Sequence, residues 1–145
     1  MNVKSILGVK GSDVATVGQE ASLAAAAAQL RDRKVGALVV SDDGSHIDGI
    51  ISERDVVRAL AAHGSGALGR TVASAMSADV VTCRDDDSVE ELMVQMTERR
   101  IRHLPVVDDN GALAGIISIG DVVKGRLDQL ETENQALFEY LHQGR

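Results

Sequence analysis

Two short motifs in this chain combine residue types that could hold an anion. Ser52 and Asp55 form the first motif, and Ser118 and Asp121 form the second, each at the end of a Gly-Ile-Ile-Ser run. We expect both motifs at a junction between a strand and a helix, where backbone N–H groups are unpaired and can receive an anion. A simpler role stays open, because Asp in a first helical turn also stabilises the helix through its dipole, by ~0.3–1 kcal/mol.

Catalysis and metal binding have little support in the sequence. Cys83 is the single cysteine, so no intramolecular disulfide can form. The histidines lack metal-ligand spacing, and the chain has no P-loop and no paired acid and base. The four histidines are His46, His63, His103 and His142. We therefore expect no catalytic residue and no metal site, and Cys83 is interpreted as a small buried strand residue.

The charge balance argues against nucleic acid and membranes as partners. The 145 residues include 15 Lys and Arg and 22 Asp and Glu, a net charge of −7 that repels polyanions. Phe138 and Tyr140 are the whole aromatic set that could stack on bases. The longest apolar run, Leu23 to Ala28, is far shorter than the ~20 residues of a membrane-spanning helix. The start also lacks the features of a secretory signal, so we expect a cytoplasmic protein.

The chain is an internal duplication. A shift of 66 positions aligns residues 49–57 with residues 115–123, and seven of these nine positions are identical. The same shift aligns residues from Asp13 to Asp43 with matching residues of the second copy. A shorter similarity, residues 3–7 with residues 72–76, is displaced by 69 positions. The repeat therefore covers nearly all of residues 1–125, and the link before each unit differs by three residues.

Each copy predicts the same order of strand, helix, strand, strand and helix. Short strands are expected at 14–17 and 80–83, and Ser22 and Ser88 are expected to cap the helices that follow. Asp-rich turns with glycine join the next two strands of each copy into hairpins. The hairpin strands are 37–40 with 47–52, and 104–107 with 113–118, followed by helices from Glu53 and Ile119.

These features resemble a tandem pair of cystathionine-beta-synthase (CBS) domains, the arrangement called a Bateman module. The resemblance rests on the two Gly-Ile-Ile-Ser-x-x-Asp motifs, the hairpin before each, and the stretch Ile101-Arg102-His103-Leu104-Pro105-Val106-Val107-Asp108. It implies a mixed α/β (α+β) fold. Two units related by a pseudo-twofold axis would each contain a small three-stranded sheet with two helices, and a long C-terminal helix would follow.

The resemblance also implies two clefts that bind adenine nucleotides. AMP is the first choice, and ADP, ATP or NAD are alternatives. The motif aspartates, Asp55 and Asp121, would take the ribose hydroxyls, since an ionised carboxylate can accept both hydrogens of a diol. The phosphate-binding set would be Ser52, Arg54, Ser118, Arg102 and His103. Backbone and apolar groups of Ala15, Thr16, Val17, Val81, Thr82 and Cys83 would hold the adenine.

The sequence leaves open where Arg102, His103 and the other residues of the basic run 99–103 lie. Alternation along the following strand would send Arg102 and His103 to opposite sides, so they need not serve one cleft. The run 99–103 also suits a solvated helix end. The second motif has Ile119-Gly120 where the first has Glu53-Arg54, so the second cleft lacks an equivalent arginine and unequal affinity is expected.

The expected domains are residues 1–66, a first CBS domain with an N-terminal helical segment, residues 67–125, a second CBS domain, and residues 126–145, a helical extension. Residues 64–69 match the pattern G-x-G-x-x-G, but a helix precedes them, so we interpret them as a flexible connection. Val123, Leu127, Leu130, Asn134, Leu137 and Leu141 follow a heptad pattern on the C-terminal helix. This pattern favours a parallel homodimer, with packing of the helix on its own domain as the alternative.

The sequence thus predicts a regulatory protein and no enzyme. An adenine nucleotide would change its conformation or assembly, and a separate effector protein would sense that change. The alternatives are a structural dimer with empty clefts and a nucleotide-processing enzyme at the same clefts.

Overall fold

Each half of the duplicated sequence forms a small three-stranded sheet with helices packed on it, as predicted. The computed structural model of the chain describes residues 1–143. The strand orders are β1-β2-β3 and β4-β5-β6, with the outer strand parallel to the middle one and the last two antiparallel. The first unit has β1 (Thr16–Val17), α2 (Leu23–Arg33), β2 (Ala37–Val40), β3 (Gly49–Ser52) and α3 (Glu53–His63). The second has β4 (Cys83–Arg84), α5 (Val89–Arg99), β5 (His103–Val107), β6 (Leu113–Ser118) and α6 (Ile119–Gln143).

The first helix of each unit begins where the sequence predicts. The hydroxyl of Ser22 accepts a hydrogen bond from the Ala25 backbone N–H at 3.1 Å, and that of Ser88 accepts one from Glu91 at the same distance. A capping side chain satisfies a donor that has no partner within the helix. Lys34 and Arg100 end these two helices in the left-handed conformation, each with φ of 54°.

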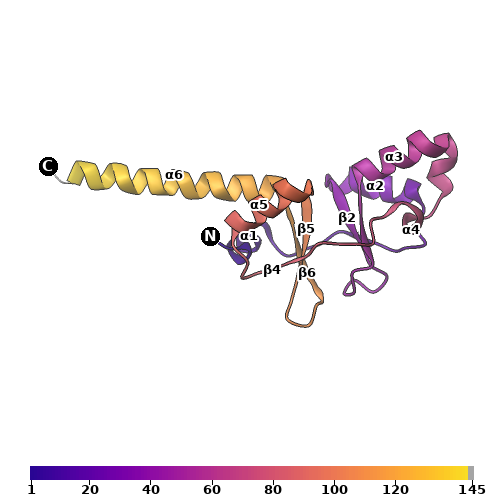
Figure 1. Ribbon diagram of the computed structural model, residues 1–145, viewed down its shortest axis with the longest axis horizontal. Coiled ribbons are helices and arrows are strands. Elements are labelled where there is room, and N and C mark those ends of the chain that lie inside the picture. Colours follow the sequence, from indigo (N-terminus) through magenta and orange to yellow (C-terminus); the bar gives the residue numbers. More distant parts are fainter. Residues whose placement is uncertain (144–145) are drawn as a thin grey trace.

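The two short helices before the units are exchanged between them. Helix α1 (Val3–Lys10) packs on β6 and α6, and its Val3 lies in the core with Leu92 and Ile117 of the second unit. Helix α4 (Val72–Ala75) packs on β3 and α3, and its Val72 lies in the core of the first unit. Figure 1 shows α1 beside β4–β6 and α4 beside β2. The N-terminal helical segment, which the sequence analysis groups with the first domain, thus makes its packing contacts with the second unit.

The glycine-rich connection, interpreted from the sequence as flexible, is a short helix packed on the first unit. Residues Gly64–Gly69 form a 3-10 helix, η1, that contacts α2 and α3. Ala67 is almost fully buried in this contact. The apolar side chain in the middle of the segment therefore ties the connection to the first unit.

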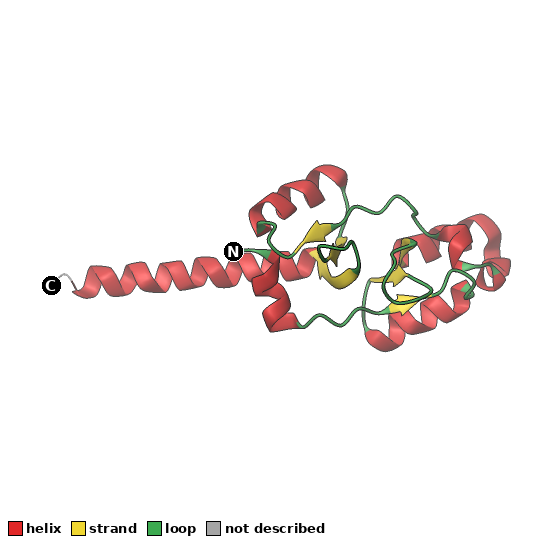
Figure 2. Ribbon diagram, turned by 90° about the horizontal axis from the view of Figure 1, so that it is seen from below, coloured by secondary structure: helices red, strands yellow, loops and turns green. Residues whose placement is uncertain are grey.

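Helix α6 is 25 residues long and extends well beyond the second unit. In Figures 1 and 2 it runs straight away from both sheets. Its buried residue is Val122, at the base, and all residues from Leu130 to Gln143 are exposed. The base of α6 packs on α1, α5 and β6, so packing on its own domain holds for that part of the helix and not for residues 130–143. The last two positions of the predicted extension, 144–145, lie outside the described residues.

Among residues 1–143, no helix combines the length and the apolar character that a membrane crossing needs.

Candidate functional site

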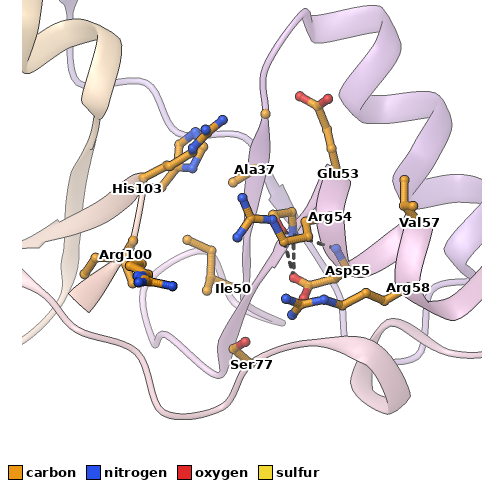
Figure 3. A pocket seen from close by; sticks show the side chains of 14 residues that line it. Ala37, Ile50, Glu53, Arg54, Asp55, Val57, Arg58, Ser77, Arg100 and His103 are labelled. Atoms are coloured by element: carbon orange, nitrogen blue, oxygen red, sulfur yellow. Dashed lines mark hydrogen bonds between the residues drawn. The ribbon is translucent and has the colours of Figure 1, made fainter. Parts of the chain in front are cut away.

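A cavity of about 700 Å³ lies between the two units, at the start of α3. This volume is in the range of small-molecule sites. Figure 3 shows that side chains of the first unit face those that precede and begin β5 in the second unit. The cavity is lined by Gly36, Ala37, Ile50, Ser52, Glu53, Arg54, Asp55, Val57, Arg58, Ser77, Arg100, Ile101, Arg102 and His103.

Ser52 and Asp55, which both line this cavity, are hydrogen-bonded to each other. The backbone N–H of Ser52 donates to Asp55 Oδ2 at 2.8 Å, and its hydroxyl donates to the same oxygen at 3.0 Å. The Asp55 N–H donates back to Ser52 Oγ at 3.4 Å, which completes a capping box. Within the described residues no hydrogen bond reaches Asp55 Oδ1. The helix-capping role and an open acceptor oxygen therefore coexist in Asp55.

Arginines from both units converge on the cavity. Arg54 and Arg58 come from one face of α3, four residues apart, and Arg100 and Arg102 come from the segment before β5. Both Arg102 and His103 line the cavity, contrary to the alternation argument. The reason is that β5 begins at His103, so Arg102 precedes the pleated strand. Arg58 was not predicted, although its i, i+4 spacing from Arg54 is a signal in the sequence.

The side chain of His103 in the second unit lies close to Gly36 of the first unit. A Cβ atom on Gly36 would lie 3.2 Å from the imidazole Cε1 of His103 and 3.1 Å from a carboxylate oxygen of Glu53. Glycine at this position therefore leaves room for the ring. Burial lowers the pKa of His103, and the positive charge of Lys10 lowers it further, against opposing contributions from Asp121 and Glu53. The imidazole is thus held toward its neutral form.

The motif in the second unit has a different environment, because the side chain of Lys10 binds its aspartate, Asp121. Lys10, the last residue of α1, donates from Nζ to Asp121 Oδ2 at 2.5 Å and to the Ile116 carbonyl oxygen at 2.8 Å. Ser118 N–H donates to the same Asp121 oxygen at 2.9 Å. Burial raises the pKa of Asp121, but the hydrogen bonds from Lys10 and Ser118 outweigh it, so the net shift is downward.

The three-residue difference between the two links explains this asymmetry. Leu7 lies against Gly115, and Met76 lies against Gly49, so Leu7 and Met76 are equivalent at a displacement of 69 although the two glycines are 66 positions apart. A Cβ atom on Gly49 would be 2.7 Å from the Met76 sulfur, which leaves no room for a side chain there. Helix α1 continues for three residues beyond Leu7, whereas α4 ends before Met76. The extra turn carries Lys10 to Asp121, and Ser77 lines the cavity at Asp55 instead.

The second motif also lacks counterparts of three basic residues that line the cavity at Asp55. At the shift of 66, the counterparts of Arg54, Arg102 and His103 are Gly120, Gly36 and Ala37. The predicted difference in ligand affinity between the two motifs therefore rests on three replaced residues and not on one arginine.

The six residues predicted to hold adenine do not line the cavity at Asp55. Val17 and Cys83 are buried in the two cores, and β1 and β4 pair with the middle strands of the sheets. Burial raises the pKa of the Cys83 thiol to about 12, with a further contribution from Asp87, which agrees with a structural residue. The apolar wall of the cavity comes from Ala37, Ile50 and Val57. The sequence offered no signal for this wall, because it depends on how the units face each other.

No group of three or more His, Cys, Asp or Glu side chains that could bind a metal ion is formed within the described part of the chain.

Comparison with known proteins agrees with this architecture. A CBS-domain containing protein from Agrobacterium tumefaciens is 49% identical, with a TM-score of 0.83 over 87% of this chain and 99% of its own. A CBS domain protein from Pyrobaculum aerophilum complexed with AMP is 27% identical, with a TM-score of 0.74 over 83% of this chain and 89% of its own. A CBS domain pair in complex with 5′-methylthioadenosine and S-adenosyl-L-methionine is 26% identical, with a TM-score of 0.77 over 89% of this chain and 98% of its own.

Several curated relatives are longer than this chain, which spans 76%, 57% and 63% of the length of three of them. The sequence profile of the CBS domain family matches residues 3–62 and 72–128. With two matches that cover most of the sequence, and two sheets in the arrangement of solved CBS pairs, this chain belongs to the CBS domain family as a tandem pair.

Proposed function

We propose that this protein is a regulatory CBS pair that binds one adenine nucleotide, with AMP as the first choice, in the cavity at Asp55. The observation that carries the proposal is the asymmetry of the two motif aspartates. Asp55 lies in a cavity of about 700 Å³ lined by four arginines, whereas Asp121 is paired with Lys10 at 2.5 Å. The relatives solved with AMP and with S-adenosyl-L-methionine support an adenosine ligand.

Each part of a nucleotide has a chemical complement in the cavity. Asp55 Oδ1 is an acceptor for the ribose hydroxyls. The phosphate would lie near the start of α3, where backbone N–H groups, Arg54 and Arg102 provide positive charge. Ala37 and Ile50 offer an apolar wall for the adenine. These assignments replace the earlier expectation for adenine and keep those for ribose and phosphate at the first motif.

Regulation would follow from the position of the cavity between the two units. A ligand that contacts α3 on one side and residues 100–103 on the other favours one relative arrangement of the units. A ligand shifts a conformational equilibrium when its affinity differs between the two states. The resulting change in conformation or assembly would be sensed by an effector protein, and no turnover of the nucleotide is expected.

The test is a set of thermal melts with AMP, ADP, ATP, NAD, NADH and S-adenosylmethionine, followed by calorimetry with the best ligand. Binding to the native state alone stabilises by ~2.7 kcal/mol when the ligand is at 100 times its Kd. We expect a clear rise in Tm and a stoichiometry of one per chain. No shift with any of these ligands would contradict the proposal and leave a structural dimer as the better account.

Asp55→Ala and Asp121→Ala form a matched pair for locating the ligand. Each variant loses a helix cap, at about 1 kcal/mol, so its ligand-induced shift is compared with its own ligand-free melt. We expect Asp55→Ala to abolish the shift and Asp121→Ala to keep it. The reverse result would assign the ligand to the second cleft.

A further inference from the structure

The outer part of α6 is an apolar helix surface that its own chain leaves uncovered. Leu127, Leu137 and Leu141 are each more than half exposed, and Phe138 and Tyr140 flank them. Figure 1 shows this part of the helix far from both units. A single helix of ~12–15 residues without tertiary contacts is marginal in water. A stable α6 of this length therefore needs a partner surface.

The spacing of the apolar residues identifies the kind of surface. Taking Leu127 as heptad position a, positions a and d are filled from Val123 to Leu141 at alternating steps of four and three. This repeat is typical of a two-stranded coiled coil, in which a and d side chains pack between two helices. The seam residues are Val123, Leu127, Leu130, Asn134, Leu137 and Leu141. The exposed leucines thus form one continuous stripe along α6.

We infer that α6 forms a parallel, in-register coiled coil with α6 of a second copy of this chain. Asn134 indicates both the partner of α6 and the relative direction of the two helices. In a parallel pair it faces Asn134 of the second copy, and the two amides can hydrogen-bond to each other. In the antiparallel pair that keeps the whole seam matched, position a faces position d, so Asn134 would face Leu130. That arrangement buries amide groups without hydrogen-bond partners, which is unfavourable.

The charges beside the seam favour the same arrangement. Arg126 is at position g and Glu131 at position e, and a parallel coiled coil brings position g of one helix near position e of the other. Each Arg126 would then face a carboxylate of the second copy. Within one chain Arg126 reaches Gln129 at 2.9 Å and Glu90 at 3.3 Å. Its guanidinium is thus held at the base of the seam by groups of its own chain.

The body of the protein offsets the shortness of the seam. Fewer than three heptads make a weak coiled coil when the helices are free, since each helix must first be nucleated. Here α6 is nucleated by the folded second unit, because Asp121 N–H donates to Ser118 Oγ at 3.1 Å and Val122 is fully buried. Dimer formation then extends a helix that already exists.

This arrangement leaves the cavity at Asp55 outside the dimer contact. The cavity lies between the two units, whereas α6 leaves the second unit in the opposite direction (Figures 1 and 2). The inference therefore does not rest on the proposed nucleotide function, and either can fail without the other.

Sedimentation of the full-length protein tests the inference. We expect the wild type at micromolar concentration to have twice the 15.3 kDa mass of the chain. Leu137→Glu places charge in the seam and should give a monomer. Ala136→Glu adds the same charge at the neighbouring position c, outside the seam, and should remain a dimer. A monomeric wild type, or a dimer that survives Leu137→Glu, would overturn the inference.

A cysteine at Leu141 tests the direction of the helices. In the parallel pair, two Leu141→Cys side chains face each other and should form an interchain disulfide under mild oxidation. In the antiparallel pair Leu141 faces Val123, so the two cysteines would be about 27 Å apart at 1.5 Å per residue. Cys83 is buried and should not compete. A dimer that forms no disulfide would exclude the parallel arrangement.

Asn134→Leu should give larger oligomers beside the dimer, because the polar residue restricts oligomeric state.

Discussion

The ammonium group of Lys10 lies 2.5 Å from the carboxylate of Asp121, although the two residues are at opposite ends of the repeat. The contact exists because α1 of the first copy packs on the second unit. It gives one motif aspartate a cation from its own chain and leaves the other, Asp55, beside a cavity. Two nearly identical motifs thus acquire different chemical environments.

Removal of the Lys10 ammonium should make the protein less stable near neutral pH. The side chains of this pair are 30% and 24% exposed, so we expect Lys10→Ala to cost no more than about 1 kcal/mol. The pKa of Asp121 is lowered in the folded state, so its contribution is present above the ordinary value of 3.8 and is lost as the pH falls through the folded value. Urea denaturation of wild type and variant should therefore converge in acid.

Lys4→Ala is the control for this experiment, because Lys4 is an exposed lysine on the same helix. An equal loss of stability in Lys4→Ala would show that the effect comes from α1 in general and would contradict a specific role for the Lys10–Asp121 pair.

Arg58→Ala should weaken binding of a phosphorylated ligand more than binding of adenosine. Arg58 is exposed at the rim of the cavity, so we expect a loss of roughly five- to tenfold for AMP, about 1–1.4 kcal/mol. Calorimetry with AMP and with adenosine measures the difference. Arg33→Ala removes an exposed arginine that does not line this cavity and should bind AMP as the wild type does. Equal losses for the two ligands would place Arg58 away from the phosphate.

The stability of the protein should fall as the pH is lowered through the titration range of His103. Its pKa in the folded state lies below the ordinary 6.5, so the unfolded chain takes up the proton first. The contribution of His103 is complete above 6.5 and is lost as the pH falls through the folded value. Urea denaturation from about pH 7.5 to about pH 5.5 should show a smaller decrease in His103→Gln than in the wild type.

His142→Gln is the matched control, because His142 lies on the projecting part of α6. If its pH dependence changed as much as that of His103→Gln, a specific contribution of the buried imidazole would be excluded.

Cys83 should resist thiol reagents in the native protein and react after unfolding. Its side chain is almost fully buried, and burial raises the pKa of the thiol to about 12, so the reactive thiolate is scarce. Absorbance at native conditions and in denaturant, with a chromogenic disulfide reagent, measures both rates. Fast modification of the folded protein would show that β4 opens readily.

The sequence by itself determined the duplicated topology, because the signals for it are local. Ser22 and Ser88 begin their helices by bonding backbone groups three residues away, and glycine-containing turns close both hairpins. The motif residues Ser52 and Asp55 were found for the same reason, since their mutual hydrogen bonds span three positions. The heptad spacing of α6 was equally visible.

Only the tertiary structure decided which residues share a cleft. The exchange of α1 and α4, the approach of His103 to Gly36 and the wall formed by Ala37, Ile50 and Val57 all depend on contacts between distant segments. Such contacts arise from the packing of whole surfaces, and no short stretch of sequence encodes them. For this reason the sequence predicted unequal motifs from Ile119-Gly120, whereas the pairing of Lys10 with Asp121 was visible only in the structure.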